Sequence, residues 1–224
     1  MVAFDEGPQQ LVFDLPHRAA MDEEDFLVSD CNESAVKVID IWPDWHHPSL
    51  LIVGPQGCGK THLAYVWQMK TGAAMLSAAE LTSDMVDNLA QAPAVIIEDI
   101  DAGPFNQNAL FHLLNLAKER SFNVLMTGRE RPGTWEIELP DLRSRLRASP
   151  VVEIEAPDEL LLNTVLVKLF SDRQLIVPPN VIKYISLRME RSMSAAQKLV
   201  EKVDKAALAS GRKVTRQLVG EVMN

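Results

Sequence analysis

The sequence predicts an α/β fold, in which a parallel five-stranded sheet is followed by a small all-helical domain. Short, unbroken apolar runs alternate with helical stretches up to about residue 156, which is typical of a parallel sheet buried on both faces. After residue 157 only helical periodicity remains. With 224 residues, of which 47% are hydrophobic, the chain is long enough to bury a core in both parts.

Five apolar runs are the expected strands, and they cover residues 50–53, 73–76, 94–97, 122–126 and 151–154. The third run is rich in β-branched residues and is therefore the clearest strand, whereas the second is weak. Between the runs, apolar residues recur at helical spacing. Helices are expected there at residues 34–41, 60–70 and 108–120. Ser77 should cap a shorter helix that runs to Leu81, and Pro43 should stop the first helix.

Four helices are predicted behind the sheet, at residues 160–170, 181–189, 195–208 and 215–223. Pro178, Pro179 and Gly211 separate them. The first 25 residues carry glycine, prolines and an acidic run, which is typical of an extended arm. We therefore divide the chain into an arm at 1–25, an α/β domain at 26–156 and a helical lid domain at 157–224.

The net charge of −9 argues against strong direct DNA binding, because non-specific affinity comes from Lys and Arg that neutralise phosphates. Only Arg143–Arg147 and Arg212–Arg216 are candidate basic patches, and their simpler interpretations are a solvated loop and a solvated helix start. The two cysteines, Cys31 and Cys58, have no metal-ligand spacing. No apolar run is long enough to span a bilayer, and the N-terminus does not resemble a secretory signal. A cytoplasmic protein without a membrane partner is expected.

The strongest motif is G-x-x-x-x-G-K-[ST], which is complete in Gly54, Pro55, Gln56, Gly57, Cys58, Gly59, Lys60 and Thr61. Glycines let consecutive backbone N–H groups turn toward an anion, and the helix that follows adds its positive dipole end. Lys60 would reach the outer phosphates, and Thr61 would supply a hydroxyl to Mg²⁺. A strand precedes the motif and a helix follows it, as this motif requires, so a chance match is the minor alternative.

The third strand ends in two adjacent carboxylates, Glu98 and Asp99. Carboxylates at a buried strand end can hold the water shell of Mg²⁺ and orient an attacking water. The simpler interpretation is an acidic strand end in solvent. Glu98 stands where an aspartate is more usual, and its extra methylene changes its reach.

A phosphate loop, an acidic strand end, an arginine segment and a helical lid together resemble the AAA+ ATPases, a class of P-loop NTPases. Residues 26–32, Phe-Leu-Val-Ser-Asp-Cys-Asn, resemble the N-terminal box of the bacterial initiator DnaA and its relatives. That resemblance implies an adenine pocket bordered by Leu27, Val28 and Asn32, with ADP or ATP as the ligand. Residues 142–146, Leu-Arg-Ser-Arg-Leu, resemble the arginine-finger segment of the same proteins.

A DnaA-like AAA+ core that ends after its lid, here at Asn224, resembles the Hda family of DnaA regulators. Residues 10–15, Gln-Leu-Val-Phe-Asp-Leu, resemble peptides that bind the DNA polymerase sliding clamp. Gln10 would be the polar anchor, and the apolar anchors would be Leu11, Phe13 and Leu15. The alternative is that these apolar side chains pack on the protein's own core.

The resemblance also implies roles for single residues. Arg145 would be the arginine finger and would act on ATP bound to DnaA, although a surface arginine is the simpler interpretation. Thr127 would sense the terminal phosphate, but Gly128-Arg129 follows it where relatives often have an aspartate. Ser194 stands where a sensing arginine is expected in the lid, with Arg191 one turn earlier. Little independent ATPase activity is therefore expected.

The expected function is an adenine-nucleotide-binding regulator that turns off chromosome replication initiation. It would bind the sliding clamp and DnaA, and would promote hydrolysis of the ATP that DnaA holds; a second copy of the chain is a further candidate partner. Two rivals stay open: an AAA+ ATPase that loads or remodels another replication protein, and a degenerate AAA+ scaffold with an empty site. The intact motif at 54–61 speaks against the scaffold.

Overall fold

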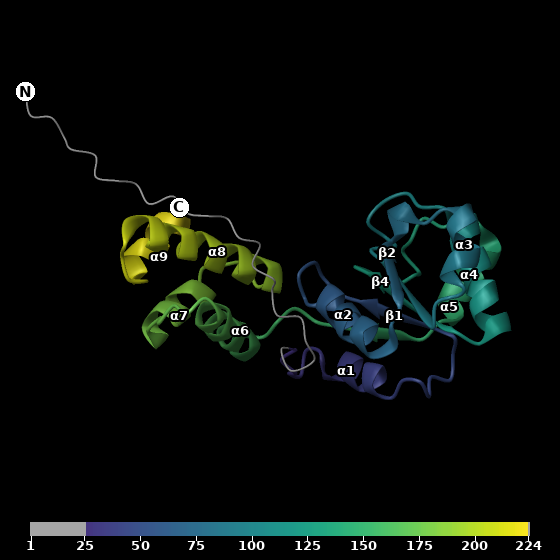
Figure 1. Ribbon diagram of the computed structural model, residues 1–224, viewed down its shortest axis with the longest axis horizontal. Coiled ribbons are helices and arrows are strands. Elements are labelled where there is room, and N and C mark those ends of the chain that lie inside the picture. Colours follow the sequence, from purple (N-terminus) through teal and green to yellow (C-terminus); the bar gives the residue numbers. More distant parts are fainter. Residues whose placement is uncertain (1–25, 224) are drawn as a thin grey trace, which may run out of the picture. The chain divides into compact units, whose positions relative to one another are not determined.

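The computed structural model describes residues 26–223, which form two compact units that divide between Ala156 and Pro157 (Figure 1). The predicted arm at 1–25, with the proposed clamp-binding residues Gln10, Leu11, Phe13 and Leu15, lies outside the described residues. Across the described residues, no helix is both long and apolar enough to cross a membrane.

The first unit contains the predicted parallel five-stranded sheet, and the predicted α/β fold is confirmed. Its strands are β1 (Ser49–Val53), β2 (Ala74–Ser77), β3 (Ala94–Glu98), β4 (Asn123–Gly128) and β5 (Val151–Glu153). Their spatial order is β2-β3-β4-β1-β5, and every neighbouring pair is parallel. Because β1 and β3 both flank β4, the carboxyl ends of these three strands meet at one edge of the sheet.

Alternate residues of the strands point to opposite faces, and each face has its own core. One core joins Leu51, Val95 and Met126 to the helices α3 (Val86–Leu89), α4 (Gln107–Arg120) and α5 (Pro140–Ala148). The other core joins Ile52, Ile96 and Leu125 to α1 (Glu33–Asp40) and α2 (Lys60–Thr71). Figure 1 shows the two sets of helices on either side of the sheet. Strands covered on both faces explain why the strand sequences are unbroken apolar runs.

Three helical details differ from the sequence prediction. The helix expected from Ser77 to Leu81 is a single 3-10 turn at Ala78–Glu80, where the Glu80 carboxylate accepts hydrogen bonds from the backbone and hydroxyl of Ser77. Residues 83–89 form a further 3-10 turn and α3, which were not predicted. The arginine-rich segment is a helix, α5, rather than a loop. Pro140 at its first turn and buried Leu142 and Leu146 at i,i+4 spacing explain it.

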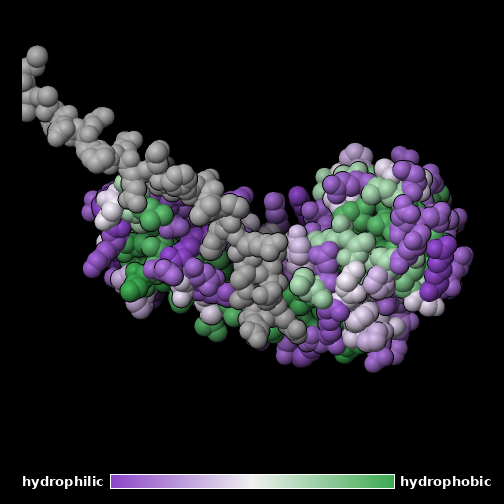
Figure 2. Space-filling model, in the orientation of Figure 1, coloured by the Kyte–Doolittle hydropathy of each residue, from purple (hydrophilic) through white to green (hydrophobic). Residues whose placement is uncertain are grey.

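The second unit is the predicted lid, with α6 (Glu159–Asp172), α7 (Pro179–Ser186), α8 (Met193–Ser210) and α9 (Arg216–Met223). Asp158 and Ser192 cap α6 and α8 by accepting hydrogen bonds from backbone N–H groups. Helix α7 begins and ends earlier than predicted, because Pro179 occupies its first turn. Apolar side chains from all four helices form one core. Figure 2 shows that both units also carry hydrophobic surface between hydrophilic areas.

Candidate functional site

The loop between β1 and α2 is shaped by three glycines, of which Gly54 is required by a close contact and the other two by their backbone angles. A Cβ on Gly54 would lie 2.1 Å from the carbonyl oxygen of Ile154 and 3.0 Å from the Cys58 sulfur. Gly57 and Gly59 have left-handed backbone angles, with φ of 75° and 113°, a region that side chains disfavour. The glycines of the motif are therefore required by the backbone conformation of the loop.

Lys60 begins α2 and folds back over this loop. Its side chain is almost fully buried, with 7% of its surface exposed. The ammonium donates hydrogen bonds to the carbonyl oxygens of Gly54, at 2.7 Å, and Pro55, at 3.0 Å. No carboxylate neutralises it in any ion pair of the described residues. A cation beside the N-terminus of a helix favours the binding of an anion there, because the positive charge and the helix dipole act together.

The two carboxylates after β3 differ in their surroundings. Glu98 is half-buried, and its Oε1 atom is buried and has no hydrogen-bond partner among residues 26–223. Burial raises the pKa of its carboxyl group; nearby Thr61 and Lys60 act in the opposite direction, and Asp99 adds to the increase. Asp99 is exposed and has a left-handed φ of 55°. Glu98 is thus the carboxylate that lies against the phosphate loop.

The oxygen donors at this point fit Mg²⁺. Magnesium is usually bound by one or two carboxylates, together with water and substrate phosphates. Glu98 supplies a buried carboxylate oxygen that has no hydrogen-bond partner among the described residues, and the Thr61 hydroxyl acts on the same carboxyl group by lowering its pKa. Exposed Asp99 is the next residue along the chain and would act through water. These three residues are the ones expected from the sequence to hold the metal.

Thr127, the predicted phosphate sensor, lies at the carboxyl end of β4 and is fully buried. Its hydroxyl oxygen accepts a hydrogen bond of 3.0 Å from the backbone N–H of Asp99, and the hydroxyl also lowers the pKa of Glu98. Thr127 therefore links the ends of β3 and β4. Its role as a sensor stays a prediction.

The segment that resembles the N-terminal box lies beside the phosphate loop. The Phe26 ring meets the His62 ring edge-on at 5.1 Å, and it lies 3.8 Å from the position of a Cβ on Gly59. The Asn32 amide accepts from the backbone of Ser29 and donates to the carbonyl of Leu27. Asn32 therefore holds the segment in shape.

Val28 is 55% exposed and leaves apolar surface available at the predicted adenine border. Leu27 is half-buried beside it. The contact between Phe26 and His62 was not predicted, because nothing in the sequence relates two rings on separate segments.

Arg145, the predicted arginine finger, is half-buried on α5. Its guanidinium lies over the Phe111 ring of α4, 5.7 Å from the ring centroid. Its neighbour Arg147 is exposed. In the lid, Ser194 lies in the first turn of α8, and its hydroxyl is 3.3 Å from that of Ser192.

Comparisons with known proteins agree with this architecture. A family model described as "Hda, lid domain" matches residues 163–223, and one described as "RNA helicase" matches residues 50–135. An uncharacterized protein of Haemophilus influenzae is 26% identical over 81% of this chain and 84% of its own length. The chromosomal replication initiator protein DnaA of Cutibacterium acnes is 23% identical over 67% of this chain, which spans only 35% of that initiator.

Among solved structures, domain III of the Thermotoga maritima replication initiation protein DnaA has the same fold, with a TM-score of 0.75. The superposition covers 90% of this chain and 95% of that one, at 18% identity.

Proposed function

We propose that this chain, a DnaA-related and Hda-like AAA+ protein, is an adenine-nucleotide-binding regulator of chromosome replication initiation. One observation carries the nucleotide part: a complete phosphate loop has a buried cation, Lys60, on one side and a half-buried carboxylate, Glu98, on the other. The match to the Hda lid and the relation to DnaA support the regulatory part.

In this proposal the loop backbone and Lys60 bind the phosphates of ADP or ATP, and the segment at 26–32 borders the adenine. Mg²⁺, when bound, would neutralise charge on the phosphate oxygens, and Thr61, Glu98 and Asp99 would hold it directly or through water. Nucleotide binding would displace the Lys60 ammonium from the carbonyl groups of Gly54 and Pro55 that it now contacts.

We further propose that Arg145 acts on ATP held by DnaA. A guanidinium that reaches developing phosphate charge can raise the rate of hydrolysis by roughly 10³ or more. In the structure, Arg145 contacts α4 of its own chain through Phe111, which keeps the guanidinium on the helix surface. The arm would meanwhile bind the sliding clamp and bring the regulator to DNA.

The test is hydrolysis of labelled ATP bound to DnaA, measured with the clamp loaded on DNA and with this protein added. Arg145→Ala should reduce the stimulated rate by roughly a thousandfold, whereas Arg147→Ala, an exposed arginine of the same helix, should not. Deleting residues 1–16 should abolish clamp binding and leave ADP binding intact. Equal loss in both arginine variants would refute the assignment of Arg145, and loss of nucleotide binding in the deletion would show that the arm belongs to the core.

A second candidate is an AAA+ ATPase that loads or remodels another replication protein. It is favoured by the pairing of Glu98 with Thr61 in an otherwise complete site. Steady turnover on the order of 1 s⁻¹ by the isolated protein, within the ordinary range for enzymes, would select this candidate. Slower turnover combined with stimulated hydrolysis on DnaA would select the regulator.

A further inference from the structure

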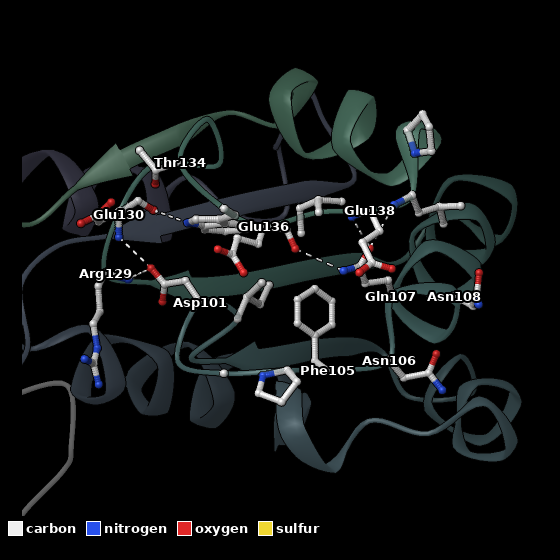
Figure 3. A pocket seen from close by; sticks show the side chains of 17 residues that line it. Asp101, Phe105, Asn106, Gln107, Asn108, Arg129, Glu130, Thr134, Glu136 and Glu138 are labelled. Atoms are coloured by element: carbon white, nitrogen blue, oxygen red, sulfur yellow. Dashed lines mark hydrogen bonds between the residues drawn. The ribbon is translucent and has the colours of Figure 1, made fainter.

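The α/β unit contains a cavity of about 1140 Å³ between the segment that follows β3 and the segment that follows β4 (Figure 3). The proposed function uses none of its lining residues. The cavity is larger than the roughly 300–1,000 Å³ of an ordinary small-molecule site, so it has room for several side chains of a partner.

Its walls are held by hydrogen bonds to backbone groups. The Gln107 amide accepts from the N–H groups of Glu138 and Leu139 and donates to the carbonyl of Glu136. One oxygen of Asp101 accepts from the N–H groups of both residues that follow β4, at 2.7 and 2.9 Å. The cavity is therefore a built feature of the fold, and the side chains of Glu136 and Glu138 are not needed to maintain it.

The charge of the lining is strongly one-sided. Among the described residues that line it, four are acidic, Asp101, Glu130, Glu136 and Glu138, and one is a cation, Arg129. Figure 3 shows the Glu136 carboxylate directed into the cavity, the Asp101 carboxylate turned toward the backbone of Arg129 and Glu130, and the Arg129 side chain directed away from the cavity.

Two aromatic side chains complete the lining. Phe105 points into the cavity (Figure 3), and Trp135 packs over Gly128 with its indole N–H donated to a backbone carbonyl. Aromatic faces beside carboxylates favour a desolvated cation, because the ring quadrupole and the negative charges act in the same direction. Such a surface repels nucleic acid, whose binding needs Lys and Arg.

We propose that this cavity is a docking site for a protein partner that inserts an arginine or lysine side chain beside Phe105 and the carboxylates of Glu136 and Glu138, which are exposed and line the cavity. The cavity wall contacts α5, because Arg143 of that helix donates a hydrogen bond to the carbonyl of Ile137, which lines the cavity. A docked segment would therefore lie beside the helix that carries Arg145.

The test uses the full chain and a short fluorescein-labelled Gly-Ser peptide that carries two arginines, with a matched glutamine peptide as the reference. Fluorescence anisotropy should report saturable binding of the arginine peptide only. The double variant Glu136→Gln with Glu138→Gln should weaken binding by roughly three- to thirtyfold, since two ion pairs are lost. Phe105→Ala should weaken it about two- to fivefold.

Glu119→Gln combined with Glu159→Gln is the matched control, because it removes the same charge from exposed positions outside the cavity lining. Peptide affinity in this control should stay at the wild-type value. The glutamine variants should unfold at the wild-type temperature, whereas Phe105→Ala should remain folded with a lower Tm, because Phe105 packs against the core of the unit. Equal weakening in the control would overturn the proposal, because it would mean that only the net charge attracts the peptide. Binding of a labelled oligothymidine that the cavity variants weaken would also overturn it.

Discussion

Gly54→Ala tests whether the phosphate loop depends on close contact between its first residue and the neighbouring strand segment. The added methyl carbon would lie 2.1 Å from the carbonyl oxygen of Ile154, whereas real contacts of this kind do not fall below 3.0 Å. The two backbones must therefore separate by about 1 Å.

Backbone hydrogen bonds on both sides of β1 oppose the separation of Gly54 from Ile154. The N–H of Gly54 donates to the carbonyl of Gly128 on β4, and the N–H of Ile154 donates to the carbonyl of Val53. Overpacking of this kind costs about 1–3 kcal/mol, which lowers Tm by roughly 2–12 °C for a chain of this size. A displaced loop should also lose at least one hydrogen bond to a charged phosphate, and we expect ADP affinity to fall about tenfold or more.

Differential scanning calorimetry and isothermal titration with ADP measure the two effects. Gly133→Ala is the matched control, because a Cβ at Gly133 meets nothing within 4 Å. This control should keep its Tm and its ADP affinity. If Gly54→Ala kept both as well, the loop would not have the rigidity that we infer from its contacts.

Three further predictions concern the same unit. Lys60→Ala should weaken ADP and ATP binding by roughly ten- to hundredfold in calorimetry, because a charged donor to the phosphates is lost. Glu98→Gln should raise Tm at neutral pH without ligand, because it removes a buried carboxylate whose pKa is raised by burial. Asn32→Ala should lower the free energy of unfolding by about 1–3 kcal/mol in urea titrations and weaken ADP binding, because it deletes both side-chain hydrogen bonds of the adenine-border segment.

The sign of the Glu98 effect follows from proton linkage. The pKa of this carboxyl is higher in the folded state than in the unfolded chain, so folding favours proton uptake. Its contribution to stability is therefore fully present below the unfolded pKa and is lost as the pH rises through the folded pKa. Glu98→Gln should be more stable than the wild type above that range, with little difference at low pH. A variant that is less stable at pH 8 would contradict this reasoning.

Lys60→Ala and Asn32→Ala can be tested in the same way, and Lys60→Ala has a matched control on the same helix. Lys70→Ala changes another lysine of α2, one that contacts Asp40 rather than the loop, and should leave nucleotide affinity unchanged. Unchanged ADP binding in Lys60→Ala would contradict the role of that ammonium. Wild-type stability in Asn32→Ala would mean that its two hydrogen bonds are replaced by water.

Local features of this protein could be predicted from the sequence alone. The phosphate loop is one of them, because its glycines and Lys60 act through backbone geometry over eight consecutive residues. The strands and lid helices are others, since burial on one or two faces leaves a periodicity in the sequence. Helix α5 was missed because its arginines obscure a stripe of only two buried leucines, Leu142 and Leu146.

The tertiary structure alone decided which distant residues meet. The order of strands brings Glu98 beside Thr61 and Thr127, and it leaves Oε1 of Glu98 buried with no hydrogen-bond partner in the described part of the chain. The tertiary structure alone also forms the cavity, because its walls come from two segments about 30 residues apart in the sequence. The Gln107 side chain joins these segments by hydrogen bonds to backbone groups. No local pattern encodes such contacts, because they depend on how the strands pair and on which face each helix covers.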